Sequence, residues 1–411
     1  MKTVAILGLG NRGSVYADGM SKNDKVKIVA VCDILSESLR QAKEKYGVDE
    51  SGLFLDEEDF FKEKRADILV IATLDQLHYR QTMRALALGY DVLLEKPVTP
   101  VYEECKAIAE YAQKQGRKVV VCHNLRYTPF YQTLKQMVAD GKIGDVVSFE
   151  QSENVGFPHY MCSFVRGKWH RQALTSPIIL QKCCHDLDII YWIIGKKCET
   201  LSSYGALGYY NEQHAPADST AHCFECPRKD CPYNATTFYV RAHESLCVPY
   251  GFDYSDENIL RYLSDKDNDY GKCVFHLDND VCDRQTVNMQ FEGGITANLI
   301  MHGFANETHR ITKIYGTKGY LEGRLEHGII TWQLYGKRKR KIDVNKLILK
   351  GEGHSGGDAK LVEDFVDYMV EGKQALGISF VSDSVYSHKL AFTAEESRLQ
   401  NGKTIRIGRE L

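Results

Sequence analysis

The stretch that decides the fold is AILGLGNRGS, residues 5–14, in which an apolar run passes through a glycine turn into a helical pattern. Gly8, Gly10 and Gly13 have the G-x-G-x-x-G spacing. In a strand–turn–helix unit such glycines let the backbone approach a pyrophosphate, and the helix N-terminus supplies N–H donors. Asp33 ends the second apolar run, where a carboxylate can bond the adenosine ribose. The combination predicts a dinucleotide-binding βαβ unit.

Asp33 also bears on the choice of dinucleotide. A carboxylate at this position repels a 2′-phosphate, and the next residues, Ile34 and Leu35, supply no arginine to compensate. Arg12 and Arg40 are the cations that could weaken the preference. We therefore expect NAD rather than NADP.

The rest of the chain predicts two α/β domains. Through residue 122, strands rich in Val, Ile and Leu alternate with helical patterns, which is typical of a parallel sheet with helices on both faces. Beyond it, TVNMQFEGGITANLIMHG (286–303) contains a Gly-Gly hairpin signal and a second hairpin follows, which indicates a mostly antiparallel sheet. We expect a Rossmann domain at 1–122, a substrate domain at 123–411, and an irregular cysteine-rich insertion at about 205–272.

Composition narrows the class of protein. A chain of 411 residues with 43% hydrophobic and 26% charged residues is typical of a globular protein with two domains. The net charge of −3 gives no electrostatic reason to expect nucleic acid or an anionic membrane as a partner. The longest apolar runs have strand length, and the N-terminus enters a glycine turn without a cleavage site, so we expect a cytoplasmic protein.

The insertion contains a cysteine pattern that suits a metal. Cys223, Cys226 and Cys231 form C-x2-C-x4-C, and clustered cysteines in a cytoplasmic chain favour metal binding over disulfides. A tetrahedral structural zinc needs a fourth ligand, for which Cys273 is the first choice and Cys247, His276 and His222 are alternatives. An iron–sulfur cluster or a set of free thiols would explain the same residues. Cys183 and Cys184 are interpreted as packing residues.

Several motifs together resemble one enzyme family. They are GLGNRG (8–13), IATLDQLH ending at His78, Glu95-Lys96-Pro97, R-Y-x-P at 126–129, K-I-G-D at 142–145, H-D-x-D at 185–188, and ITKIYGTKGYLEG at 311–323. In combination they resemble the Gfo/Idh/MocA oxidoreductases, including a subgroup with a similar cysteine-bearing insertion. The resemblance implies a Rossmann domain followed by an α/β domain with a large, mostly antiparallel sheet, often used to form homo-oligomers. The cofactor contacts it implies are Gly8, Gly10, Asn11, Arg12, Gly13, Asp33, Thr73, His78, Glu95 and Lys96.

Lys96 and His185 are the expected catalytic pair. Lys96 follows a parallel strand, at the edge where open α/β sheets bind ligands, and its ammonium can hydrogen-bond a substrate hydroxyl. His185 has Asp188 in helical register and suits abstraction of a hydroxyl proton. Family members that oxidise polyols usually carry Asp four residues before the histidine, whereas this chain has Gln181, followed by Lys182. Either His185 works with Lys96 alone, or Tyr127 or Asp188 substitutes, or the chemistry differs.

The resemblance implies activity on a carbohydrate. We expect an NAD-dependent oxidoreductase that transfers hydride between nicotinamide and a hydroxyl of a sugar, glycoside or polyol, working as a dimer or tetramer. Expected substrate contacts are Arg126, Tyr127, Arg166, Trp169, Asp188 and His354. GEGHSGGD (351–358) resembles a segment of subgroups that act on glycosides, so an NAD-dependent glycosidase is one alternative. A non-catalytic sensor or scaffold that binds the dinucleotide is the other.

Overall fold

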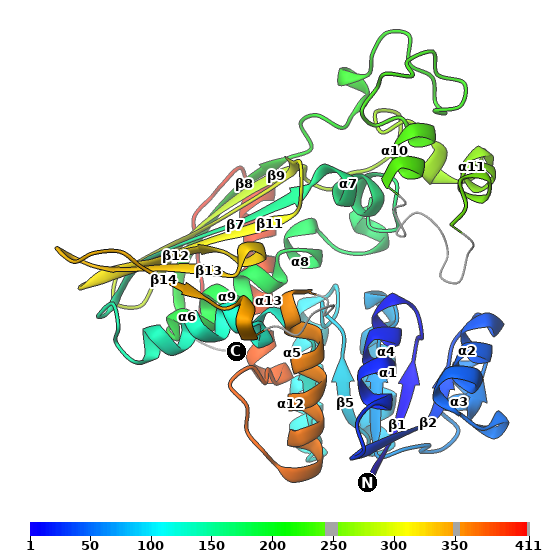
Figure 1. Cartoon of the computed structure of the whole chain (residues 1–411), viewed down its shortest axis with the longest axis horizontal. Helices are drawn as coiled ribbons and strands as arrows, with labels where there is room; N and C mark the ends of the chain where they lie inside the picture. The colour runs from blue at the N-terminus through cyan, green and yellow to red at the C-terminus, as the bar shows by residue number, and fades with distance from the viewer. Residues whose placement is uncertain (243–253, 348–353, 409–411) are drawn as a thin grey trace.

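The first half of the molecule is a parallel sheet between helices (Figure 1). The computed structural model describes residues 1–242, 254–347 and 354–408. The six strands have the order β3-β2-β1-β4-β5-β6, and every pair is parallel. Their bounds are β1 Lys2–Leu7, β2 Val26–Cys32, β3 Leu53–Phe54, β4 Ile68–Ile71, β5 Asp91–Leu94 and β6 Val119–Val121. The helices are α1 Asn11–Ser21, α2 Ser36–Tyr46, α3 Glu57–Phe60, α4 Asp75–Ala87 and α5 Tyr102–Lys114. This is the predicted Rossmann sheet, with the order that reverses between β1 and β4.

Strand β1 shows why these strands are apolar throughout. Val4 and Ile6 join the hydrophobic cluster on one side of the sheet, and Ala5 and Leu7 join the cluster on the other side. Successive side chains of a strand point to opposite faces, so a strand covered on both faces needs apolar residues at every position.

The second half is built on a nine-stranded sheet with the order β14-β13-β12-β11-β7-β10-β9-β8-β15. Only the β7–β10 pair is parallel. The predicted hairpin joins β9 to β10, with Gly293 and Gly294 at φ values of +80° and +76°. The strands are β7 Val146–Gly156, β8 Cys198–Ala206, β9 Arg284–Phe291, β10 Ile295–Ala305, β11 His309–Gly316, β12 Gly319–Arg324, β13 Ile329–Leu334, β14 Arg340–Asp343 and β15 Ile405–Arg406. The prediction of a mostly antiparallel sheet is confirmed.

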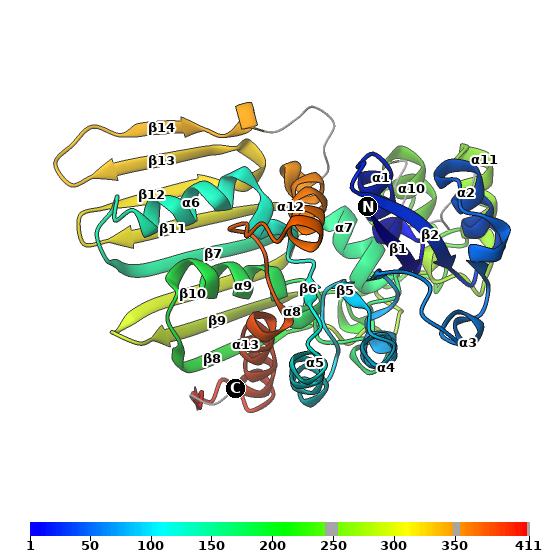
Figure 2. The same cartoon turned by 90° about the horizontal axis from the view of Figure 1, so that it is seen from below.

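Helices cover one face of this sheet (Figure 2). They are α6 Pro129–Ala139, α9 Cys184–Ile194 and α13 Val381–Leu399, with the short α7 Phe157–Tyr160 and α8 Ile178–Gln181 nearby. Burial alternates accordingly along β10, where Leu299 and Met301 are buried and Ile300 is exposed. The inward residues of the strands therefore face α9, and their partners face outward.

The C-terminal part of the chain returns to the first domain. Leu361, Val362 and Phe365 of α12 (Gly357–Glu371) belong to the same hydrophobic cluster as Val4 and Ile6. A division at residue 122 therefore separates the strands of the two sheets. It does not separate the two cores, because α12 from the C-terminal part of the chain contributes to the core of the first domain.

The cysteine-rich insertion forms a small unit of its own between β8 and β9 (Figure 1). Helices α10 (Ala235–Ala242) and α11 (Asp256–Ser264) enclose a cluster that includes Phe238, Ile259 and Leu263. None of the helices in the described ranges is both long and apolar enough to cross a bilayer.

Candidate active site

The three glycines of the first turn have different surroundings. Gly8 has a φ of +86°, which favours glycine. A Cβ on Gly13 would lie 2.0 Å from the carbonyl oxygen of Gly8, so Gly13 is required for α1 to pack on the turn. A Cβ on Gly10 would meet no atom within 4 Å. Gly10, with the exposed Asn11 next to it, therefore borders the open space that a pyrophosphate needs.

Asp33 is held beside this turn. Its Oδ2 accepts a hydrogen bond from the N–H of Leu9 at 2.7 Å, and its Oδ1 accepts one from the N–H of Leu35 at 2.9 Å. Arg40 is bound by Glu37 and Glu44 on its own helix. Arg40 is thus engaged and does not offset the carboxylate.

Arg12 and Glu95, two expected cofactor contacts, bind each other. Arg12 Nε lies 2.7 Å from Glu95 Oε1, and Arg12 Nη2 lies 2.9 Å from Asp358 Oδ1. Burial opposes ionisation of Glu95, but Arg12 and Lys96 outweigh it and hold its pKa below the usual value. Glu95 Oε2 also accepts the N–H of Lys96 at 2.9 Å. These residues position the turn that carries Lys96, and Arg12 ties it to α12.

Thr73 and His78 support the same turn. His78 is buried, with Nδ1 at 2.9 Å from the carbonyl oxygen of Pro97 and Nε2 at 3.2 Å from that of Thr73. The hydroxyl of Thr73 donates to Gln81 at 2.5 Å. His78 therefore links the turns after β4 and β5 instead of presenting a free ring nitrogen to the cofactor.

Lys96 contacts the end of α8, just before the start of α9, which carries His185. The Lys96 ammonium donates to the main-chain oxygen of Gln181 at 3.0 Å. His185 is buried, and its ring centroid lies 5.8 Å from that of His123. Burial, followed by the charges of Lys96 and His123, lowers the pKa of His185 well below its ordinary value. The imidazole is neutral at pH 7 and suited to accept a proton.

Arg126 and Asp188, both expected substrate contacts, bind each other. Arg126 Nε and Nη2 donate to the two carboxylate oxygens of Asp188, both at 2.6 Å, and both residues are buried. Tyr127 is fully buried in the core that α12 shares with the first sheet. Their expected contacts with substrate stay predictions, since in the structure Arg126 and Asp188 bind each other and Tyr127 is enclosed by the core.

Arg166 and Trp169, two other expected substrate contacts, pack against protein groups in the structure. Arg166 is buried against the insertion, where it donates to the carbonyl oxygens of Lys272 and Tyr233 at 2.8 and 2.7 Å. Trp169 packs against the core of the second domain, with its ring 6.1 Å from that of Phe164. Neither Arg166 nor Trp169 forms a hydrogen bond or ion pair with residues 95–97 in the part of the chain that the structure describes. For His354 only the backbone is described, in a turn before α12.

The four cysteines expected to bind metal converge. Cys223, Cys226, Cys231 and Cys273 line one small cavity, and Arg166 lies 3.5 Å from the Cys223 sulfur. Within the described ranges, however, no three or more His, Cys, Asp or Glu side chains are arranged to hold a metal ion. His222 and His276 do not line the cavity, and Cys247 lies outside the described residues.

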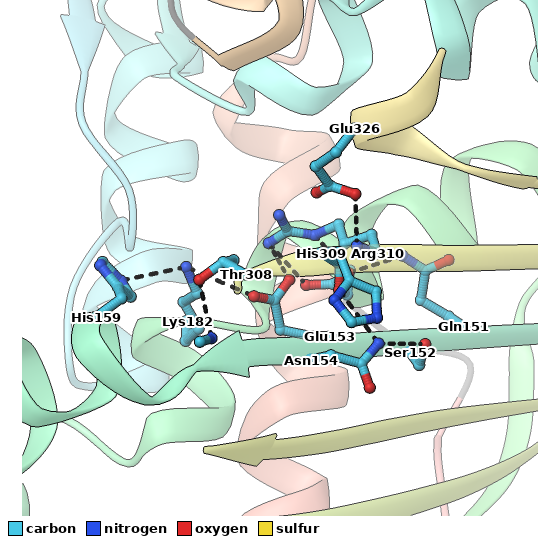
Figure 3. Close-up of polar contacts among 12 residues, drawn as sticks. Gln151, Ser152, Glu153, Asn154, His159, Lys182, Thr308, His309, Arg310 and Glu326 are labelled. Carbon is cyan, nitrogen blue, oxygen red and sulfur yellow. Dashed lines mark hydrogen bonds and ion pairs between the residues drawn. The ribbon is translucent and has the colours of Figure 1, made fainter. Parts of the chain in front are cut away.

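A polar network between the sheet and α9 was not predicted (Figure 3). Glu153 of β7 is fully buried, 2.5 Å from Arg310 Nη2 of β11 and 3.6 Å from Lys182 Nζ. Arg310 also binds Asp186, which accepts from Gln151 as well. Alternation along β7 was a usable signal, because Gln151 and Glu153 have the same parity as the buried Phe149 and Val155.

The fold and these residues define a class of protein, an NAD-binding oxidoreductase with a Rossmann domain and a separate α/β domain. Residues 2–123 match the family model described as an oxidoreductase family with an NAD-binding Rossmann fold, and residues 135–405 match the model of its C-terminal alpha/beta domain. The chain belongs to the Gfo/Idh/MocA oxidoreductase family.

Known proteins place the chain within that family. It is 27% identical over 329 residues to a Bacillus subtilis protein named oxidoreductase YteT, covering 75% of this chain and 74% of that protein. It is 27% identical over 201 residues to inositol 2-dehydrogenase of Salmonella typhimurium, covering 48% and 56%. An Agrobacterium radiobacter oxidoreductase solved with NAD+, L-tartaric acid and magnesium shares the fold with a TM-score of 0.72 and 17% identity, covering 100% and 99%. Myo-inositol 2-dehydrogenase from Lactobacillus plantarum gives a TM-score of 0.68 at 20% identity, covering 99% of each chain.

Proposed function

We propose that the protein oxidises a hydroxyl of a sugar or polyol with NAD+ and catalyses the reverse reduction. The observation that carries the proposal is that Lys96, after β5, binds the main chain four residues before the buried His185, in a chain of an NAD-binding oxidoreductase family. Relatives named as inositol dehydrogenases support a polyhydroxylated substrate.

The residues divide the reaction between them. When bound, the nicotinamide accepts hydride from the carbinol carbon. The neutral His185 accepts the hydroxyl proton, so that the C–H and O–H bonds break while the C=O bond forms. The Lys96 ammonium donates a hydrogen bond to the same oxygen and stabilises the negative charge that develops on it. In the reverse reduction, protonated His185 returns the proton to the carbonyl oxygen. The Lys96 ammonium stabilises the negative charge on that oxygen until the proton arrives.

Gln181 is compatible with this scheme. Lys96 is held by the main-chain oxygen of residue 181, and the side chain of Gln181 instead donates to Asp75 at 3.0 Å. Asp188 is bound by Arg126 and Tyr127 is fully buried, which supports a pair of Lys96 and His185 that works without a third group.

We also propose NAD rather than NADP as the cofactor. The Asp33 carboxylate and the engagement of Arg40 by two glutamates support this choice. Titration of both dinucleotides into the protein tests it, and tighter binding of NADP would contradict it.

A panel of sugars, polyols and chromogenic glycosides, read by NADH absorbance, tests the proposed function. We expect NADH from at least one free sugar or polyol, and loss of that activity in Lys96→Ala and His185→Ala. Unchanged NADH formation in both variants would overturn the catalytic assignment. Release of aglycone without accumulation of NADH would point to a glycosidase instead.

The four cysteines support a further component. We propose that they bind one structural zinc ion as thiolates, with the nearby Arg166 guanidinium offsetting the negative charge. In the described structure the four thiols line one cavity without being arranged to hold a metal ion, so binding requires them to move closer together. A closed set of four thiolates would stabilise the insertion without taking part in the reaction. Metal analysis of purified protein tests this. One zinc per chain supports it, whereas iron or no metal contradicts it.

The open face of the nine-stranded sheet suits self-association. Ile300, Phe304 and Ile311 project from it, each at least 37% exposed. An exposed apolar patch of this kind is typical of an interface. We propose a homo-oligomer formed through this face, which light scattering on the wild type and on Ile300→Lys would test.

A further inference from the structure

The carboxylates around the Lys96–His185 pair are turned inward. Four of them are buried and paired with an arginine of the protein: Asp188 with Arg126, Asp186 and Glu153 with Arg310, and Glu95 with Arg12. A fifth, the buried Asp75, accepts a hydrogen bond from the Gln181 side chain and forms no ion pair with a described residue. A ligand that enters this site therefore meets none of these four negative charges directly.

The cations beside the pair are more accessible. Lys182 follows Gln181, its side chain is 17% exposed, and its ammonium lies 3.4 Å from His159 Nε2 (Figure 3). Its nearest carboxylate, Glu153, lies 3.6 Å away and is shared with Arg310 at 2.5 Å. Lys96 is also part-exposed and forms no ion pair with any residue that the structure describes. Lys96 thus binds the main chain at the residue before Lys182, and the charges of the two ammonium groups are incompletely compensated.

This arrangement differs from the site expected of a polyol dehydrogenase. The resemblance implies an aspartate at position 181 in family members that oxidise polyols. Here a neutral amide stands at 181, turned toward Asp75, and a lysine comes next. The amide at 181 carries no charge, and Lys182 places a positive charge next to it in the sequence.

We propose that the substrate is a sugar or polyol that carries a carboxylate, and that Lys182 binds this carboxylate while Lys96 and His185 act on a neighbouring hydroxyl. The inference rests on the proposed function and names its substrate class. Lys182 is a specificity residue, and Glu153 and His159 position its ammonium. A charge-assisted hydrogen bond from an ammonium suits a carboxylate, and a phosphate offers the same chemistry, so the test includes both.

Binding is measured first, independently of turnover. The full-length protein is saturated with NADH, which blocks oxidation, and is titrated calorimetrically with galacturonate, glucuronate, galactose, glucose and glucose 6-phosphate. We expect at least one sugar acid to bind about tenfold or more tightly than its neutral parent. Steady-state rates with NAD+ are then measured on the same compounds.

Lys182→Met removes the charge at similar length, and Lys182→Arg restores it. We expect Lys182→Met to raise the KM for the sugar acid by about tenfold or more, with a smaller change in kcat and in activity on the neutral sugar. We expect Lys182→Arg to recover part of the affinity. Lys114→Met, on the exposed surface of α5, changes the net charge equally and should match the wild type. If Lys182→Met does not fold, Lys182→Gln replaces it.

Each other outcome has a definite meaning. Equal binding of acids and neutral sugars, equal losses on both in Lys182→Met, or a preference for the phosphate would overturn the inference. Oxidation of a neutral sugar without binding of any acid would overturn it and leave the proposed function standing. Binding of the acid with no NADH from any compound would retain the substrate class and contradict the proposed function.

Discussion

The ammonium of Lys96 is held by the main-chain oxygen of Gln181, at 3.0 Å, and not by a side chain. The side chain at position 181 therefore does not determine where the Lys96 ammonium is held. The amide of Gln181 serves a different partner, the buried carboxylate of Asp75.

Gln181→Ala should therefore lower stability more than activity. It leaves the main-chain oxygen in place but removes a hydrogen bond to a buried carboxylate, which costs about 1–3 kcal/mol. We expect a lower free energy of unfolding in a denaturant titration, with kcat within a few-fold of the wild type. Lys96→Met is the contrast, with a loss of kcat of about a hundredfold or more. A loss of equal size in Gln181→Ala would show that its side chain takes part in the reaction.

Gly10→Ala and Gly13→Ala form a matched pair in the first turn. A methyl group on Gly13 would lie 2.0 Å from the oxygen of Gly8, so we expect lowered thermal stability. A methyl group on Gly10 meets open space in the protein, so we expect normal folding but weaker binding of NAD. Thermal unfolding and dinucleotide titration of both variants measure this. Equal NAD affinity in Gly10→Ala and the wild type would contradict the placement of the pyrophosphate.

The Arg126–Asp188 pair should behave as a structural ion pair. Arg126→Met leaves the Asp188 carboxylate buried without its partner and is expected to cost about 3–5 kcal/mol of stability. Adding Asp188→Leu removes the stranded charge and should recover much of that loss. Denaturant unfolding of the two single variants and the double variant gives the coupling energy. If the double variant were stable but had a strongly raised KM, the pair would instead have a direct role in substrate binding.

The pH dependence of the reaction should follow His185. Burial lowers its pKa well below the ordinary value, so the neutral base form persists as the pH falls through 6.5. The acid limb of kcat/KM for oxidation should therefore lie below pH 6.5, with activity lost only as the pH falls through the lowered pKa. Rate measurements from pH 4.5 to 8 test this, with stability checked at each pH. A limb at or above 6.5 would indicate another base or a solvated histidine.

Local patterns predicted the fold well. The apolar strands of the first domain, its glycine turn and the Gly-Gly hairpin are each encoded in a few consecutive residues, and the helices and strands form where those patterns lie. The packing of α12 against the first sheet was not predicted, because the sequence of an amphipathic helix shows which face is apolar but not which sheet that face covers.

The site was predicted in part. The catalytic roles of Lys96 and His185 stay predictions. Asp188, in register with His185, is bound by Arg126 from 62 residues away. Arg166 lies in a stretch that mixes cations with an aromatic, yet it is buried against the insertion. Glu153 was overlooked because alternation shows that a residue is buried and not which charge it will meet. Partners that are distant in sequence decide each of these cases.

The return of α12 has a consequence for synthesis on the ribosome. Part of the core around β1 is supplied by Leu361, Val362 and Phe365, so the first domain stays incomplete until residues near the end of the chain have emerged. The Rossmann sheet can form early, but the apolar surface that α12 covers remains open during most of translation. A fragment ending near residue 122 should therefore be prone to aggregation, although it contains every strand of its sheet.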